Sequence, residues 1–148
     1  VGHSNGGMMS YRLAMELSHK ITAMANLAGS MMFAKKPKFP VPILHIHGTI
    51  DPAVPLSGSK HKRWPYLAID DVLKKWVKWN KCNKVADTLV NSKSYLHLKW
   101  GDQKDKIIIA SFIKNQGHDW HQITKSGFDV AENVWSFFTK RELYGLKE

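Results

Sequence analysis

The chain has 148 residues, of which 43% are hydrophobic, so it has the length and apolar content of one domain with a single core. No stretch approaches the roughly 20 consecutive apolar residues of a transmembrane helix, and we therefore expect no membrane partner. The formal net charge is +10, but only three of the 22 basic residues are arginines, the side chains that bind phosphate groups through two hydrogen bonds. We therefore expect no nucleic-acid partner.

The first half of the chain alternates between helical and strand patterns. Apolar residues recur with helical spacing from residue 5 to 19, which predicts a helix with one apolar face. The short apolar run 21–28 predicts a strand buried on both faces, and the prolines and lysines of 33–42 indicate a surface connection. A second buried strand is predicted at 43–48.

The second half continues this alternation. Two acidic residues followed by an amphipathic pattern predict a helix that covers 72–80. The segments 95–100 and 107–113, with a turn between them, predict a hairpin-like pair of strands. A final helix is predicted at 126–143, with Trp135 on its apolar face. This order of elements predicts an α/β fold with a mainly parallel sheet.

The start of the chain contains a pattern that carries chemistry. Gly2, Ser4 and Gly6 fit the G-x-S-x-G pattern of a nucleophile elbow, the tight strand-to-helix turn that exposes a serine hydroxyl. In such a turn the backbone N–H of Asn5 could donate to a developing oxyanion. The alternative is an ordinary helix N-cap by the serine, and the motif alone favours neither interpretation.

Two loops that follow predicted strands contain the partners that a serine nucleophile needs. Asp51 follows the strand at 43–48, at the end of the sheet where α/β folds gather functional residues, although an Asp-Pro turn is the alternative role for this residue. His118 lies in the loop after the last predicted strand. The chain order Ser4, Asp51, His118 is that of an α/β-hydrolase triad, with His118 as the base and Asp51 as the acid that orients it.

Other histidines compete for the role of base. His121 is a genuine competitor because it lies close to His118 in the sequence. His45 and His47 belong to a predicted strand, where packing and hydrogen bonding are their expected roles. Their spacing could suit a metal ion, but a metal site needs further convergent ligands, so we expect no metal and no cofactor.

Motifs along nearly the whole chain share one resemblance. They are the elbow at 2–9 with 11–14, the segment 28–30, the segment 45–49 with Asp51 and 54–55, the segment 76–80 with Cys82, the pair 117–118 with Trp120, and the segment 135–138. Together they resemble the polyhydroxybutyrate depolymerase and feruloyl esterase group of α/β-hydrolases, the LpqC type.

The resemblance implies a function and a set of site residues. It maps the catalytic triad of that group onto Ser4, Asp51 and His118. It implies esters of hydroxyalkanoates, or feruloyl and acetyl esters of plant polysaccharides, as substrates, and it implies secretion. We expect Trp120, and His3 within the elbow, to line the substrate pocket.

Two positions depart from the pattern of that group. His121 stands where the group usually has proline, which could reshape the mouth of the pocket. Cys82 lacks the downstream cysteine with which the group would pair it. This second departure argues against a disulfide of that type and weakens the expectation of secretion.

The sequence therefore predicts a carboxylic ester hydrolase that works through an acyl-enzyme on Ser4, without a cofactor, on an ester substrate that can be polymeric. A peptidase or lactonase on the same fold is one alternative, because a triad fixes acyl transfer but not the leaving group. A non-catalytic module that binds anionic polymers through its basic surface is another.

The resemblance also implies a position within a larger domain. It corresponds to the C-terminal portion of a single α/β-hydrolase domain, without the early strands and the second oxyanion loop. We therefore expect the strand at 21–28 to be an exposed apolar edge. We also expect the chain by itself to be weakly stable and weakly active.

Overall fold

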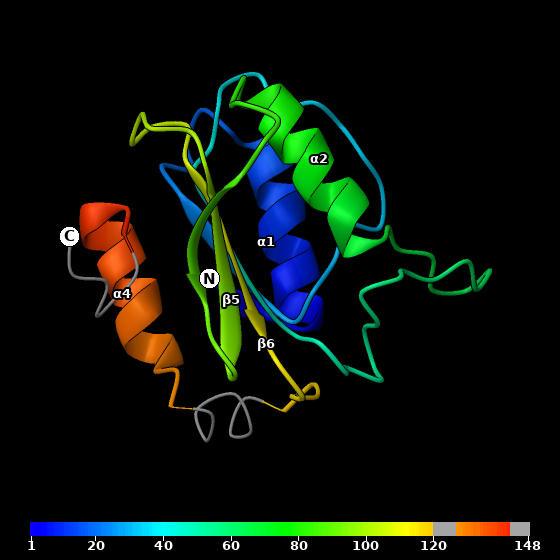
Figure 1. The fold of residues 1–148 in the computed structure, drawn as a ribbon. Helices are drawn as coiled ribbons and strands as arrows, with labels where there is room; N and C mark the ends of the chain where they lie inside the picture. Colours follow the sequence, from blue (N-terminus) through cyan, green and yellow to red (C-terminus); the bar gives the residue numbers. More distant parts are fainter. Residues whose placement is uncertain (120–126, 143–148) are drawn as a thin grey trace.

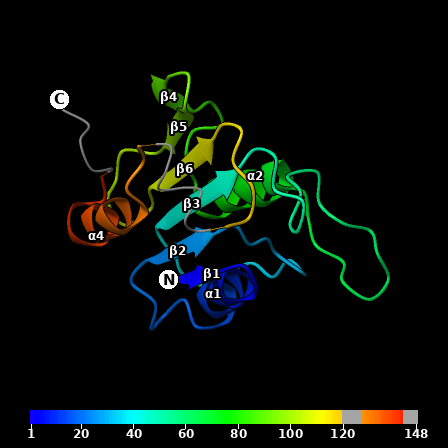
Figure 2. The ribbon, with the colours of Figure 1, turned by 90° about the horizontal axis from the view of Figure 1, so that it is seen from below.

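A six-stranded mixed sheet forms the centre of the molecule, and its strands lie in the order β1-β2-β3-β6-β5-β4 (Figure 1, Figure 2). The structure is a computed structural model that describes residues 1–119 and 127–142. The strands are β1 (Gly2–His3), β2 (Met24–Leu27), β3 (Ile43–Gly48), β4 (Asp87–Asn91), β5 (Tyr95–Trp100) and β6 (Ile108–Ile113). With helices packed against this sheet, the described residues adopt an α/β fold.

Two kinds of strand pairing meet at β6. The pairs β1–β2, β2–β3 and β3–β6 are parallel, whereas β5 is antiparallel to β6 and β4 is antiparallel to β5. The predicted hairpin-like pair at 95–100 and 107–113 is therefore confirmed. The sequence did not predict β4, whose residues are mostly polar and none of which is fully buried. Such a strand suits the edge of a sheet, where polar side chains discourage pairing with another chain.

Helices cover both faces of the sheet (Figure 2). On one face lie α1 (Asn5–Glu16) and α2 (Ile69–Trp79), and on the other lies α4 (Val130–Lys140). Each face has its own hydrophobic core: Tyr11, Trp76 and Ile108 belong to the first, and Leu27, Ile46 and Phe137 belong to the second. None of the helices in the described ranges combines the length and the apolar character needed to cross a membrane.

The first elements are shorter in the structure than in the prediction. α1 ends at Glu16 rather than at residue 19, and β2 covers 24–27 of the predicted 21–28. The prediction that this strand is an exposed edge is wrong, because β1 pairs with it and all four of its residues are buried. A two-residue strand carries too little pattern to be recognised in a sequence.

The buried face of α4 also differs from the predicted one. Trp135 is 67% exposed, whereas Phe137 is fully buried. The buried side chains recur at Val130, Asn133 and Phe137, which form a second stripe with the helical period. Spacing alone could not choose between the two stripes, because the stripe that packs on the sheet includes the polar Asn133, whose amide donates to the backbone carbonyl one turn earlier.

Asn80, just beyond α2, joins three segments through one buried side chain. Its amide nitrogen donates to Val41 O at 2.8 Å and to Lys106 O at 2.9 Å, and its amide oxygen accepts from Val41 N at 3.3 Å. Val41 precedes β3 and Lys106 precedes β6. The side chain therefore fixes the starts of two neighbouring parallel strands relative to α2.

Replacement of Asn80 with alanine is expected to lower the free energy of unfolding by about 1–3 kcal/mol, because backbone groups of Val41 and Lys106 lose their partner. Urea unfolding followed by circular dichroism measures this loss. Asn83→Ala, at an exposed position in the same loop, is the matched control and should change the free energy by less than about 0.5 kcal/mol. Equal stability of the two variants would contradict the anchoring role of Asn80.

Candidate active site

Ser4 occupies the turn between β1 and α1 in a backbone conformation that is rare for serine. Its φ is 54° and its ψ is −119°, and its N–H donates to Leu27 O at 2.7 Å. The side chain makes no capping hydrogen bond to α1, which argues against the ordinary N-cap. A positive φ persists only where the surroundings impose it, so the turn holds the serine hydroxyl in a fixed direction.

Two glycines near Ser4 allow β1 and α1 to approach each other. A Cβ atom on Gly2 would overlap the carbonyl group of Gly6, and a Cβ atom on Gly7 would overlap the amide oxygen of Asn26. Gly6 itself has open space where its Cβ would lie. The close packing of the turn therefore depends on Gly2 and Gly7, although the sequence motif consists of Gly2 and Gly6.

Asp51 lies in the loop after β3, and both oxygens of its buried carboxylate are bonded. Oδ1 accepts the backbone N–H groups of Ala53 and Val54 at 2.9 and 2.8 Å, so the residue does form a turn. Oδ2 lies 2.8 Å from His118 Nδ1. The two roles that were alternatives in the sequence therefore coexist, because each uses a different oxygen.

The carboxyl group of Asp51 has a pKa of about 2 despite its burial. Burial by itself raises this pKa, because it disfavours a charge. Hydrogen bonds from His47, from the Val54 N–H and from His118, together with the charge interaction with His118, lower it by more. Asp51 is therefore an anion at neutral pH.

His118 lies in the loop after β6 and bridges the other two side chains. Its Nδ1 is 2.8 Å from Asp51 Oδ2, and its Nε2 is 2.8 Å from Ser4 Oγ. An ionised carboxylate can only accept, so Nδ1 carries the proton and Nε2 accepts from the serine hydroxyl. The structure thus brings together the three side chains that the sequence singled out.

His3 holds the loop that carries His118. Its Nε2 is 2.9 Å from the backbone carbonyl oxygen of His118, so this nitrogen donates, and the two imidazole rings lie 5.0 Å apart. The predicted pocket residue is thus half-buried directly beside the predicted base. Trp120, the other predicted pocket residue, and His121, the competing base, lie outside the described residues.

The N-terminus of α1 lies directly beside Ser4. Asn5 is the first residue of the helix and is exposed. The first N–H groups of a helix have no acceptor within it, and they lie at the positive end of the helix dipole. The backbone N–H of Asn5 is therefore suited to donate to an anion that forms next to Ser4.

His45 and His47 are fully buried in β3 and hydrogen-bonded, as predicted, and one of these bonds joins the two rings. The sequence did not predict that His47 Nε2 lies 3.4 Å from Asp51 Oδ2. The available signal for this contact was the spacing of His47 and Asp51, which lie four residues apart across the end of a strand. Within residues 1–119 and 127–142, no three His, Cys, Asp or Glu side chains gather so that they could hold a metal ion.

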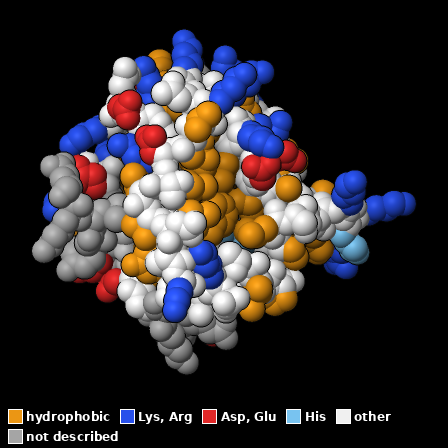
Figure 3. All heavy atoms as spheres, viewed as in Figure 1, with side chains coloured by type: hydrophobic (Ala, Val, Ile, Leu, Met, Phe, Trp, Pro, Cys, Tyr) orange, Lys and Arg blue, Asp and Glu red, His pale blue; other side chains and the backbone are white. Residues whose placement is uncertain are grey.

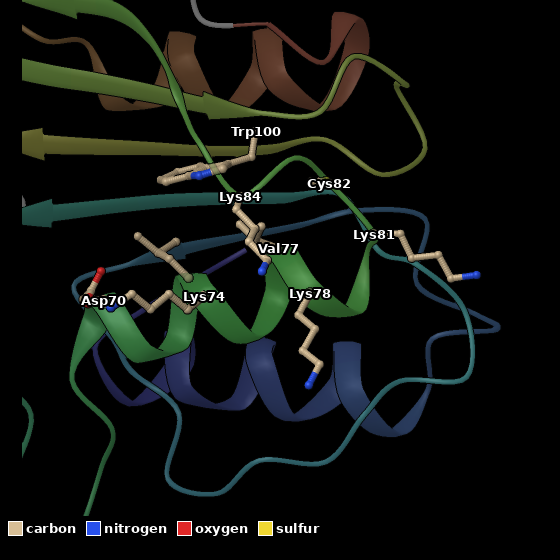
Figure 4. A pocket seen from close by; sticks show the side chains of 9 residues that line it. Asp70, Lys74, Val77, Lys78, Lys81, Cys82, Lys84 and Trp100 are labelled. Atoms are coloured by element: carbon tan, nitrogen blue, oxygen red, sulfur yellow. Dashed lines mark ion pairs between the residues drawn. The ribbon is translucent and has the colours of Figure 1, made fainter.

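A separate hollow of about 670 Å³ lies between α2 and β5, where hydrophobic side chains gather on the surface (Figure 3, Figure 4). It is lined by Asp70, Leu73, Lys74, Val77, Lys78, Lys81, Cys82, Lys84 and Trp100, and by no member of the predicted triad. Burial raises the pKa of the Cys82 thiol, which donates to Lys106 O. Such a thiol is a weak nucleophile, so this hollow does not replace the cluster around Ser4 as the candidate site.

Gly2→Ala is expected to lower the melting temperature, because the added Cβ displaces the turn. Gly6→Ala is the matched control. It should raise the free energy of unfolding by up to about 1 kcal/mol, since alanine favours a helix. Thermal unfolding measures both effects. Greater damage from Gly6→Ala would show that this account of the packing is wrong.

The low pKa of Asp51 predicts a loss of stability in acid. An aspartate in an unfolded chain has a pKa of about 3.9, so the folded chain gains stability that is present above about pH 5 and disappears as the pH falls toward about 2. The loss is on the order of 2 kcal/mol. Urea unfolding across this pH range measures it.

Two variants test the origin of this acid effect. Asp51→Asn should be less stable than the wild type at neutral pH and should lose less stability in acid, because it has no carboxylate to protonate. Asp105→Asn, at an exposed position, should follow the wild type. An unchanged pH dependence in Asp51→Asn would exclude Asp51 as the source.

Known proteins with similar sequences are described as esterases. The chain is 29% identical over 145 residues to the bifunctional acetylxylan esterase/xylanase XynS20E of Neocallimastix patriciarum, a match that covers 94% of the chain and 19% of that protein. It is 38% identical over 61 residues to NocK of Nocardia uniformis subsp. tsuyamanensis, a protein assigned as an esterase, with 39% of the chain and 18% of that protein covered. No family model matches the chain. Each match thus covers about a fifth of the length of the known protein, and the similarity supports an ester hydrolase function.

Proposed function

We propose that the chain is a carboxylic ester hydrolase of the α/β-hydrolase type, with Ser4 as nucleophile, His118 as base and Asp51 as the acid that orients it. The observation that carries the proposal is the pair of 2.8 Å contacts that join Asp51 to His118 and His118 to Ser4. The strained turn at Ser4 and the parallel strands that precede each residue suit this fold. The similarity to two proteins described as esterases supports the same chemistry.

In this mechanism, Ser4 Oγ attacks the carbonyl carbon of the ester. His118 Nε2 takes the hydroxyl proton as the new C–O bond forms, which gives a tetrahedral oxyanion and an imidazolium. Asp51 stabilises the imidazolium through the Nδ1–H bond. The backbone N–H of Asn5 donates to the oxyanion, so that both developing charges have a partner.

The tetrahedral intermediate then expels the alcohol, which takes the proton from His118. The acyl group remains on Ser4 as an ester. Water attacks this ester while His118 accepts its proton. The second tetrahedral intermediate then breaks its bond to the Ser4 oxygen, which takes that proton back from His118, and the acid is released. His118 can act as base in both halves because Asp51 holds the proton on Nδ1 throughout.

For the substrate we propose an ester group on a polymer. XynS20E is described as an acetylxylan esterase, which favours an acetyl ester of a polysaccharide, while feruloyl esters and hydroxyalkanoate esters are the other candidates. We further propose that His3 and Trp120 line the pocket next to the scissile bond. The placement of His3 in the pocket is supported by its ring, which lies 5.0 Å from the ring of His118.

Ser4→Ala is expected to lower the kcat for p-nitrophenyl acetate by a factor on the order of 10⁶ and to prevent labelling by a fluorophosphonate, because the nucleophile is removed. Ser10→Ala is the matched control. Ser10 belongs to the same helix, but its hydroxyl donates to Gly6 O rather than to His118, so both signals should persist. Peptide mass spectrometry locates the label, and labelling that survives Ser4→Ala would refute the serine mechanism.

A comparison of substrates, together with a heparin-binding test, separates ester hydrolysis from the alternatives. p-Nitrophenyl esters of acetate, ferulate and 3-hydroxybutyrate compare the candidate acyl groups, and peptide anilides test for a peptidase. Turnover of anilides at the rate of the esters would favour a peptidase. Retention on heparin that depends on salt and is unchanged in Ser4→Ala, without any turnover, would favour a binding module.

A further inference from the structure

Four buried polar side chains form a row behind the candidate site. Tyr11 Oη and Asn26 Nδ2 lie 2.8 and 2.9 Å from His45 Nδ1. His45 Nε2 lies 3.2 Å from His47 Nδ1, and the two imidazole rings are stacked at 5.2 Å. All four residues are buried. The mechanism described above uses none of them, yet polar groups are buried at a cost unless they are hydrogen-bonded.

The last member of this row reaches the loop of Asp51. His47 Nε2 lies 2.8 Å from Val54 O and 3.4 Å from Asp51 Oδ2. Val54 in turn donates its own N–H to Asp51 Oδ1 at 2.8 Å. His47 therefore acts on both carboxylate oxygens, on one directly and on the other through the backbone of Val54.

The positions of the protons follow from the two carbonyl groups at the ends of the row. Asn26 Nδ2 lies 3.0 Å from Gly29 O, which fixes its amide group as a donor on this side, so it also donates to His45 Nδ1. His45 then carries its proton on Nε2 and donates to His47 Nδ1. At the other end, Val54 O can only accept, so His47 Nε2 carries a proton. The Asn26 amide at one end and the Val54 carbonyl group at the other thus both require His45 and His47 to carry their protons on Nε2.

Burial keeps the side chains of His45 and Tyr11 uncharged. It lowers the pKa of His45 well below its usual value, and the neighbouring His47 lowers it further. Burial also raises the pKa of Tyr11 far above its usual value, so the hydroxyl keeps its proton. His45 and Tyr11 therefore stay uncharged near neutral pH.

We propose that His47 is a positioning residue for Asp51, and that Asn26, His45 and Tyr11 hold it in the tautomer that donates. The inference rests on the proposed function, because it assigns a role to a residue that acts on the acid of the triad. His47 does not touch the substrate. Its hydrogen bond to Val54 O fixes the turn that orients the carboxylate, and its Nε2 lies 3.4 Å from the oxygen that faces His118.

Two variants of His47 test the proposal in the full chain. His47→Leu has a similar size and no donor, whereas His47→Gln places an amide N–H near the position of Nε2. His47→Leu is expected to lower the kcat for p-nitrophenyl acetate about tenfold with little change in KM. His47→Gln should stay close to the wild type. An unchanged kcat in a folded His47→Leu variant would overturn the proposal.

A measurement on the wild type keeps the proposal testable if His47→Leu does not fold. Nitrogen-15 NMR of the imidazole rings should report the Nε2–H tautomer for both His45 and His47. A proton on Nδ1 of His47 would overturn the proposal. Failure of the proposed function is distinguishable, because hydrolysis would then persist in Ser4→Ala, whereas failure of this inference leaves Ser4 essential and His47 dispensable.

Discussion

The rest of the site depends on the hydrogen bonds that the ionised carboxylate of Asp51 accepts. A residue that is only 4% exposed can stay charged only if hydrogen bonds replace its lost water, and here donors reach both carboxylate oxygens. Two of these donors come from its own turn and a third comes from His118 in the loop after β6. Through His118 the same carboxylate reaches the turn after β1. One buried charge therefore connects the ends of three parallel strands.

The elements that sequence patterns predicted well are those whose residues face one kind of environment. β3 and β6 are short apolar runs because both of their faces are buried, and α2 has a clear apolar stripe because one side packs on the sheet. The patterns failed where tertiary packing decides the outcome. β4 is a polar edge strand, and α4 turns a stripe that contains Asn133 toward the core while Trp135 faces water.

The three candidate residues of the site could be singled out from the sequence, because functional loops follow strands in α/β folds and the order of the residues is specific. The contacts that support them could not. The overlap that a Cβ on Gly7 would cause, and the approach of His47 to Asp51, depend on how a helix and a loop sit against the sheet. Neighbours of this kind are set by three-dimensional packing rather than by spacing along the chain.

The unusual backbone conformation of Ser4 has an evolutionary consequence. A glycine would adopt a φ of 54° with less strain, but it would bring no hydroxyl to this turn. Selection for stability therefore favours glycine at this position, whereas selection for the proposed chemistry favours serine. In a lineage released from the need for the proposed reaction, the serine should be among the first residues to be replaced, while Gly2, whose role is spatial, should persist.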